Sequence, residues 1–262
     1  MDFKRVVACG DMHCGHRVGL TPPKYQSQRH GDYYFRVQKE LHSYFKSSIE
    51  KIKPIDILIH NGDGIDGKGF RSGGTELIES DRTKQVDMAV ENLLLAEAKH
   101  YVLTYGTPYH VGKEDDWEGM IATRLKDKGY DATIESQAWI SVNDVVFDIK
   151  HKVGSSTVPY GRSTPQKKEQ TWNLIWADIG EQPRSDIFLR SHVHYFDFSG
   201  NATYLAMTLP ALQGQGAKFG ERQCTGVVDF GFVYFDIYKN GKIDFEQCIL
   251  HAESQKREAR IL

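Results

Sequence analysis

Apolar and polar positions alternate along the first hundred residues in a way that predicts strands and helices in turn. Short apolar runs at 4–9, 55–59 and 101–105 are typical of buried strands, and a glycine follows each of them within a few residues. Between these runs, apolar residues recur every three or four positions over 33–52 and 79–99, as in helices with one buried face. This order predicts an α/β sheet with parallel strands.

The second half of the chain is richer in predicted strands. Asn143 and Asp144 form a turn signal between the apolar stretches 139–142 and 145–150, and a helix is expected at 165–179. Further strands are predicted at 187–190, 204–208, 227–238 and 243–249, with a hairpin turn at Asn240-Gly241 between the last two. A second half with so many strands favours a second sheet packed on the first. Because no repeat, low-complexity tract or linker interrupts the chain, residues 1–262 are predicted to form a single domain.

Composition is that of an ordinary globular protein, with 262 residues of which 40% are hydrophobic and 26% charged. The formal net charge of −2 provides no overall basic field for nucleic acid, although a local patch could still bind it. No apolar run approaches the roughly 20 residues that span a bilayer, so no membrane partner is expected. The first residues lack a secretory h-region and the cysteines are sparse, which predicts a cytoplasmic protein with reduced thiols.

Polar residues cluster directly after the three strands predicted in the first half. Asp11 and His13 follow the first strand, Asp63 follows the second, and Thr107 and His110 follow the third. Ligands of open α/β sheets bind outside the carboxyl ends of the strands, so these side chains are expected to converge there.

Three histidines follow later predicted strands, namely His151, His192 and His194. Residues two apart share a face in an extended segment, so His192 and His194 can reach one site together. Any one of these positions could be an ordinary turn or packing residue. The whole set, always at strand ends, instead favours a metal site, because mixed Asp and His ligands suit zinc, manganese or iron better than calcium.

The ordered series resembles the motifs of the calcineurin-like metallophosphoesterase superfamily, which read D-x-H, G-D, G-N-H, H and G-H-x-H. The corresponding segments here are Gly10-Asp11-Met12-His13, Gly62-Asp63, His151-Lys152 and Ser191-His192-Val193-His194. The resemblance implies two mixed β-sheets packed as a sandwich and flanked by helices. It also implies two divalent transition-metal ions, with Mn²⁺ favoured over Zn²⁺, Fe and Ni²⁺. The segments GDMHCGH and GLTPP also resemble sequences of phage and prophage members of this superfamily.

Carried over by motif, the resemblance implies six metal ligands. Asp63 would bridge the two ions. The first ion would be held by Asp11, His13 and His194, and the second by His151 and His192.

The third motif departs from the family pattern. After Gly106 the chain reads Thr107-Pro108-Tyr109-His110, so Thr107 takes the place of the family's Asn ligand and the histidine arrives two residues late. His110 is then either the general acid that protonates the leaving group or the missing metal ligand. Both alternatives remain open.

The resemblance implies a metal-dependent hydrolase of phosphate esters that uses a metal-bridging hydroxide, with a phosphodiester as the favoured substrate. His16 is a candidate for contact with the scissile phosphate or a residue that caps its own turn, and Asp66 is a candidate partner for a ligand histidine. Arg17 and Arg162 lie in loops beside the motifs and are candidate phosphate-binding residues.

The sequence defines the substrate less narrowly than it defines the class of reaction. Loops 17–31 and 64–78 combine basic and aromatic residues, including Lys68 and Phe70, as in sites that bind single-stranded nucleic acid. Nucleic acid or a nucleotide is therefore a possible substrate. The alternatives are a phosphomonoesterase and a metal-binding relative without catalysis, which the altered third motif would favour.

Overall fold

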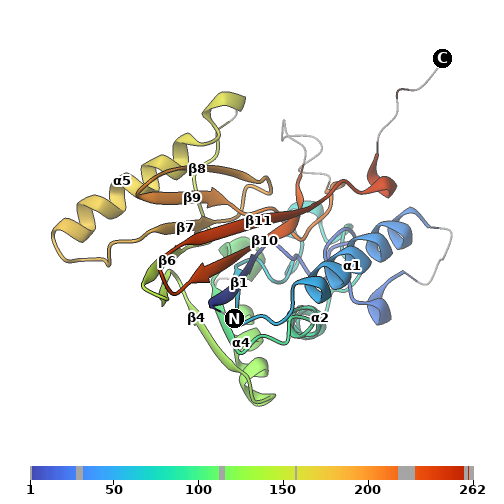
Figure 1. Ribbon diagram of the computed structural model, residues 1–262. Helices are drawn as coiled ribbons and strands as arrows, with labels where there is room; N and C mark the ends of the chain where they lie inside the picture. The colour runs from blue at the N-terminus through green and yellow to red at the C-terminus, as the bar shows by residue number, and fades with distance from the viewer. Residues whose placement is uncertain are drawn as a thin grey trace.

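The structure is a computed structural model, which describes residues 2–27, 32–111, 116–156, 158–217, 228–256 and 259. Two β-sheets pack against each other (Figure 1). The first has the order β11-β10-β1-β2-β3-β4 and the second the order β5-β6-β7-β9-β8. The strands are β1 (Phe3–Cys9), β2 (Ile57–Asn61), β3 (His100–Thr104), β4 (Asp131–Glu135), β5 (Ala138–Val142), β6 (Val145–Ile149), β7 (Ile187–Arg190), β8 (Asp197–Asn201), β9 (Tyr204–Thr208), β10 (Phe230–Tyr238) and β11 (Ile243–Leu250).

Both sheets are mixed, as the family resemblance implies. In the first, β1 to β4 run parallel, whereas β10 is antiparallel to both β1 and β11. In the second, β6, β7 and β9 run parallel, and β5 and β8 are antiparallel to their neighbours. The carboxyl ends of β1, β2 and β3 therefore meet at one edge of the first sheet, and those of β6 and β7 meet at one edge of the second.

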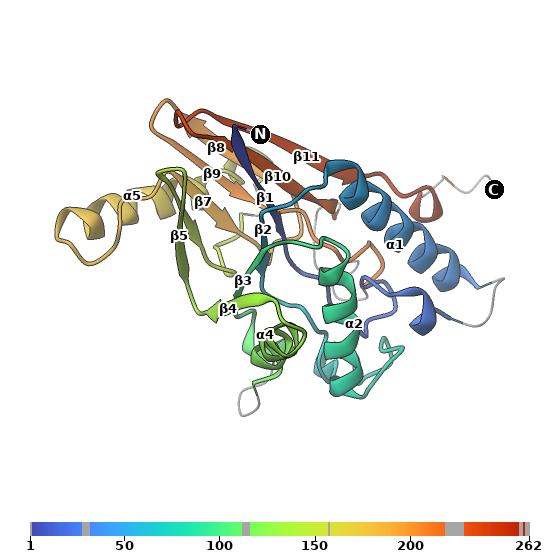
Figure 2. The same ribbon diagram turned by 60° about the horizontal axis from the view of Figure 1, so that its bottom comes forward.

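The core has two layers. Val6, Ala8 and Ile59 of the first sheet pack against Phe147 and Leu189 of the second. The other face of the first sheet is covered by α1 (Tyr33–Ile52), α2 (Arg82–Leu94) and α4 (Trp117–Asp127), while α5 (Thr164–Asp178) lies on the second sheet (Figure 2). The shorter helices are α3 (Pro108–Val111) and the 3-10 turns Pro23–Tyr25, Phe70–Ser72, Pro159–Gly161 and Glu253–Gln255.

The elements differ from the prediction mainly at their ends. The helix expected at 79–99 is shorter, because Asp81 caps it by accepting a hydrogen bond from the backbone N–H of Thr83, and the chain turns left-handed at Glu97. Strands β4 and β8 and helix α4 were not predicted. Residue 227 of the predicted strand 227–238 and residues 28–31 of the loop 17–31 lie outside the described residues. Among the described helices, none has the length and apolar character to cross a membrane.

Candidate metal centre

The backbone turns sharply at most of the predicted ligands. Within the described part of the chain, eight non-glycine residues have a positive φ angle. Five of them are predicted ligands: Asp11 (50°), His13 (44°), Asp63 (52°), His192 (75°) and His194 (57°). Left-handed backbone costs an L-residue about 1–2 kcal/mol, and such strain gathers at functional sites. Hydrogen bonds between the loops offset it, since the backbone N–H of Asp11 donates to Gly62 O and that of His13 donates to Asp63 O.

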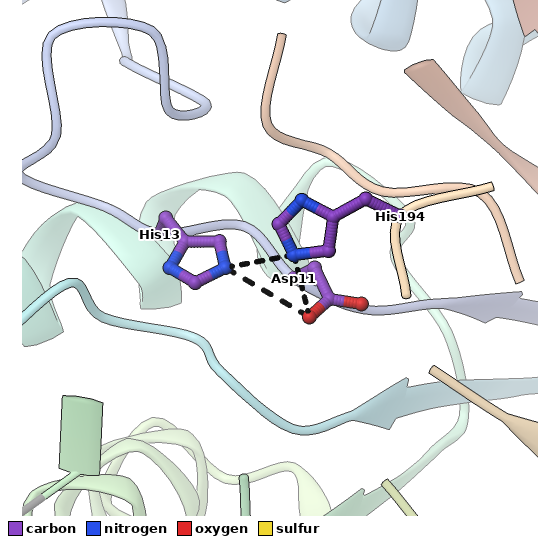
Figure 3. Close-up of side chains that lie close together, drawn as sticks. All are labelled: Asp11, His13 and His194. Atoms are coloured by element: carbon purple, nitrogen blue, oxygen red, sulfur yellow. Dashed lines mark hydrogen bonds and ion pairs between the residues drawn. The ribbon is translucent and has the colours of Figure 1, made fainter. Parts of the chain in front are cut away.

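Asp11, His13 and His194 form a first group, whose side chains point toward one another (Figure 3). Oδ1 of Asp11 lies 3.2 Å from Nε2 of His194 and 3.8 Å from Nε2 of His13. The two Nε2 atoms are 3.3 Å apart. Two ligand atoms that each lie about 2.1 Å from one tetrahedral cation are about 3.4 Å apart, so this spacing suits a metal ion.

Asp63, His151 and His192 form a second group, with ligand atoms within 4.8 Å of one another. Oδ2 of Asp63 lies 3.1 Å from Nε2 of His151, and the rings of His151 and His192 are 5.4 Å apart. Nε2 of His151 is also 4.0 Å from Oδ1 of Asp11, so the second group adjoins the first.

The atoms in these groups have lone pairs to offer a cation. Oδ1 of Asp11 and Nε2 of His151 are buried and have no hydrogen-bond partner in the described structure. Nδ1 of His151 lies 2.7 Å from the carbonyl oxygen of Asn61, which can only accept, so Nδ1 carries the hydrogen and Nε2 is left to bind. The backbone N–H of His192 donates to Oδ2 of Asp11 and orients that carboxylate. The residues therefore fit divalent transition metals.

When no cation is bound, the charges of the carboxylates determine which histidines of the site are protonated. Burial lowers the pKa of His13, but the interactions with the carboxylates of Asp11 and Asp66 outweigh it and raise the pKa to about 10. His151 behaves alike, because burial is outweighed by Asp63 and its pKa rises to about 10. Burial raises the pKa of the Asp63 carboxyl, yet His151 brings it well below its ordinary value. Protons on the histidines thus balance the buried carboxylates until a cation replaces them.

Asp66 links His13 to His110. Its Oδ1 lies 3.3 Å from Nδ1 of His13 and 3.4 Å from Nδ1 of His110. Nδ1 of His110 also lies 3.0 Å from the backbone carbonyl of Asp66, and the rings of His13 and His110 are 4.5 Å apart. His110 thus lies directly beside the first group.

Thr107 lies beside the second group. Its backbone N–H donates to Oδ1 of Asp63 at 2.7 Å, and its hydroxyl lies 3.2 Å from both carboxylate oxygens. The residue in the place of the family's Asn is therefore in direct contact with the predicted bridging carboxylate.

The other three predicted site residues lie further out. Arg17 donates to Oε1 of Glu76 at 2.7 Å and packs over the ring of Tyr34, so its charge is already paired. His16 is buried, and its Nδ1 accepts from the backbone N–H of Val18. Arg162 lies over the ring of Tyr195, the residue after His194.

Glu118 is a residue of the site that the sequence analysis missed. It comes from α4, is buried, and accepts the backbone N–H of Gly64 at Oε1 (2.8 Å) and that of Gly106 at Oε2 (2.5 Å). It thereby joins the loop that carries Asp63 to the loop that carries Thr107. Burial and the nearby charge of Asp63 raise the pKa of Glu118 to about 7. No sequence motif marks it, because its partners are backbone groups.

Comparisons with known proteins find similarity only among solved structures. No family model matches the chain, and a search of the curated proteins finds no match. An archaeal phosphodiesterase is 12% identical with a TM-score of 0.48, covering 93% of this chain and 99% of that one. A variant of Vps29 from Entamoeba histolytica is 12% identical with a TM-score of 0.47, covering 94% and 99%. Wild-type Vps29 with Zn²⁺ from the same organism is 13% identical with a TM-score of 0.41, covering 94% and 98%.

The class of the protein is supported by its own residues. Two mixed sheets with flanking helices, and two Asp–His groups at their strand ends, agree with the resemblance to the calcineurin-like metallophosphoesterase superfamily. The predicted ligand residues occur along the chain in the order of that family's motifs.

Proposed function

We propose that the protein hydrolyses phosphate esters with two divalent transition-metal ions, and that its substrate is a phosphodiester. The observation that carries this proposal is the adjacency of two Asp–His groups, which approach within 4.0 Å of each other between Asp11 and His151. Two ions held so close together would polarise the phosphoryl oxygens and supply hydroxide at neutral pH.

Each group of side chains has a distinct task in this proposal. Asp11, His13 and His194 would hold one ion, His151 and His192 would hold the other, and Asp63 would serve both. Thr107 fixes the Asp63 carboxylate through its N–H and hydroxyl. His16, Arg17 and Arg162 are proposed to act on the phosphate from outside this set; for Arg17 this requires release from Glu76.

His110 is proposed as the general acid. Its Nδ1 is engaged by Asp66, so Nε2 is the atom that can pass a proton to the leaving group. Its side chain is 19% exposed, compared with 3% for the neighbouring His13, which suits a group that meets substrate.

Aromatic side chains beside His110 support a substrate that carries a nucleobase. The ring of Tyr109 lies 4.7 Å from that of His110, and the ring of Phe70, 66% exposed, lies 6.3 Å from Tyr109. The ammonium group of Lys68 is 5.8 Å from the Phe70 ring. An exposed ring and a cation next to the proposed acid are the groups on which bases stack and phosphates bind.

A metal-by-substrate screen tests the proposal. Protein stripped with EDTA is reconstituted with Mn²⁺, Zn²⁺, Ni²⁺ or Mg²⁺ and offered a bis-aryl phosphodiester, an aryl phosphomonoester and single-stranded DNA. We expect Mn²⁺ to restore diester hydrolysis and EDTA to abolish it again. A preference for the monoester would replace the diesterase by a phosphomonoesterase, and no hydrolysis with any metal would leave the non-catalytic alternative.

Elemental analysis provides the matching structural test. Asp63→Asn should lose at least one metal ion per chain. The control is Asp131→Asn, an exposed position on β4 whose carboxylate pairs with His100; this variant should keep both ions. Full metal content in Asp63→Asn would remove Asp63 from the site.

A further inference from the structure

Exposed apolar side chains gather on and before helix α5. The described residues contain eleven exposed large hydrophobic side chains, and seven of these lie within residues 158–179. We call these seven the α5 patch: Val158, Tyr160, Trp172, Leu174, Ile175, Trp176 and Ile179. Concentrations of apolar surface of this kind mark interaction sites rather than ordinary surface.

The helix is inverted relative to an ordinary amphipathic helix. The side chains that α5 buries are the amides Gln166 and Asn173, which bond to Asp197 and Pro183. Its large apolar residues Trp172, Leu174, Ile175 and Trp176 are instead exposed. The hydrogen bonds of the buried amides hold α5 in place, and its apolar residues remain exposed as a surface for contact.

The exposed side of α5 carries a regularly spaced row of apolar residues. Trp172, Ile175, Trp176 and Ile179 are spaced by three or four residues, so they share one stripe of the helix. The rings of Trp172 and Trp176 stack with centroids 6.0 Å apart and planes 15° apart. Such a stripe matches the seam along which two helices pack.

Charges at the two ends of α5 are self-complementary. Lys167 and Lys168 are exposed near its start, and Asp178 and Glu181 are exposed at or just after its end. At 1.5 Å per residue, Lys168 lies about 9 Å before the midpoint between Trp172 and Trp176. Glu181 lies just past the other end of the helix, where the chain turns at Gly180 and the backbone N–H of Glu181 donates to the carbonyl oxygen of Trp176. Two copies of α5 that cross antiparallel at this midpoint would bring Lys168 of each to Glu181 of the partner subunit.

We propose that the α5 patch is the interface of a homodimer, in which two copies of α5 pack antiparallel across a two-fold axis. The stacked tryptophans supply the apolar centre and the Lys168–Glu181 pairs flank it. A two-fold axis requires a surface that complements itself, and the charge order of α5 meets that requirement. A membrane-binding helix would instead carry basic residues along its polar side, whereas α5 ends in acidic ones.

Sedimentation of the full-length protein over a range of concentrations tests this proposal. We expect a dimer, and we expect Trp176→Glu and Ile175→Glu, made separately, to produce monomers with wild-type melting temperature and metal content. Phe70→Ser is the matched control, because Phe70 is more exposed than either residue but lies outside the patch. A wild-type protein that stays monomeric up to about 100 µM, or a dimer unaffected by both substitutions, would overturn the proposal.

Charge exchange tests the antiparallel register. Lys168→Glu or Glu181→Lys alone should raise the dimer Kd roughly 4–25-fold, because each substitution removes two exposed ion pairs that are each worth about 2–5-fold. Combining the two should restore the wild-type Kd. If the double variant is weaker than either single variant, the register is wrong. Sedimentation of monomeric wild-type protein with vesicles of phosphatidylcholine and phosphatidylserine would assign the patch to a lipid surface and overturn the dimer.

Discussion

The carboxylate of Asp66 faces the back of the His13 ring, with Oδ1 of Asp66 3.3 Å from Nδ1 of His13. The negative charge of this carboxylate favours the hydrogen on Nδ1 of His13, and Nε2 is turned toward Asp11 and His194. Asp66 thus selects the tautomer of His13 that can bind a cation, without itself belonging to the first group.

Replacement of this carboxylate should weaken metal binding rather than folding. We expect Asp66→Asn to lower metal affinity about 10–100-fold, the usual effect of losing such a partner. Chelator competition measures the affinity, and circular dichroism checks the fold. Asp131→Asn again serves as the control. Wild-type affinity in Asp66→Asn would show that the orientation of His13 does not depend on the carboxylate.

The role of His110 can be separated from metal binding. As a general acid, His110→Ala should lower kcat roughly 10²–10⁴-fold while both ions stay bound. The loss should shrink for a diester with a very acidic leaving group, which needs no proton. Kinetics with two leaving groups, together with metal analysis, check this. Loss of an ion from His110→Ala would instead make His110 a ligand.

Thr107→Asn complements that experiment. An amide oxygen binds divalent cations better than a hydroxyl does, so this substitution should keep or raise affinity for the second ion. Calorimetric titration of the metal-free protein with the metal ion measures this affinity. A clear fall in affinity would mean that the contact of the Thr107 hydroxyl with Asp63 matters more than the ligand type.

The convergence of the site could be predicted from the sequence because each ligand directly follows a strand. Once β1, β2 and β3 are parallel neighbours, Asp11 and Asp63 must lie at one edge. The same holds for His151 and His192 after β6 and β7. The apolar runs and glycines that define those strands are local features, which can be recognised in the sequence alone.

Contacts between distant loops could not be predicted in this way. Arg17 is paired with Glu76, which is nearly sixty residues away, and neither position carries a motif. Glu118 acts through backbone N–H groups, which every residue except proline possesses, so no residue pattern marks its partners. Helix α4 itself was missed although Trp117, Ile121 and Leu125 recur at a helical spacing.

Glu118 provides a prediction that depends on those backbone contacts. Each of its carboxylate oxygens accepts one N–H, whereas a glutamine would turn an NH₂ group against one of these donors. We expect Glu118→Gln to lower metal affinity and kcat about tenfold or more, because the loops of Asp63 and Thr107 separate. Glu135→Gln, at an exposed position on β4, is the control. Unchanged kinetics and affinity would show that the loops hold their positions without Glu118.

The metal-free protein should lose stability as the pH rises. The folded-state pKa values of His13 and His151 are raised to about 10, above the ordinary value of 6.5. A raised histidine pKa means that the folded state keeps a proton that the unfolded chain releases. The resulting stabilisation is fully present below pH 6.5 and is lost as the pH rises toward 10. The melting temperature of EDTA-treated protein should therefore fall across this window.

A bound cation should reverse that dependence, because it takes the place of the protons on these histidines. Metal affinity should rise between pH 6.5 and 10, and binding at pH 8 should release protons. Calorimetry in two buffers of different ionisation enthalpy counts those protons. Asp63→Asn removes the charge that raises the pKa of His151, so this variant should show a shallower fall in the melting temperature of the metal-free protein. A flat melting temperature in the metal-free wild type, or binding without proton release, would mean that His13 and His151 are already neutral and that the buried carboxylates are balanced in another way.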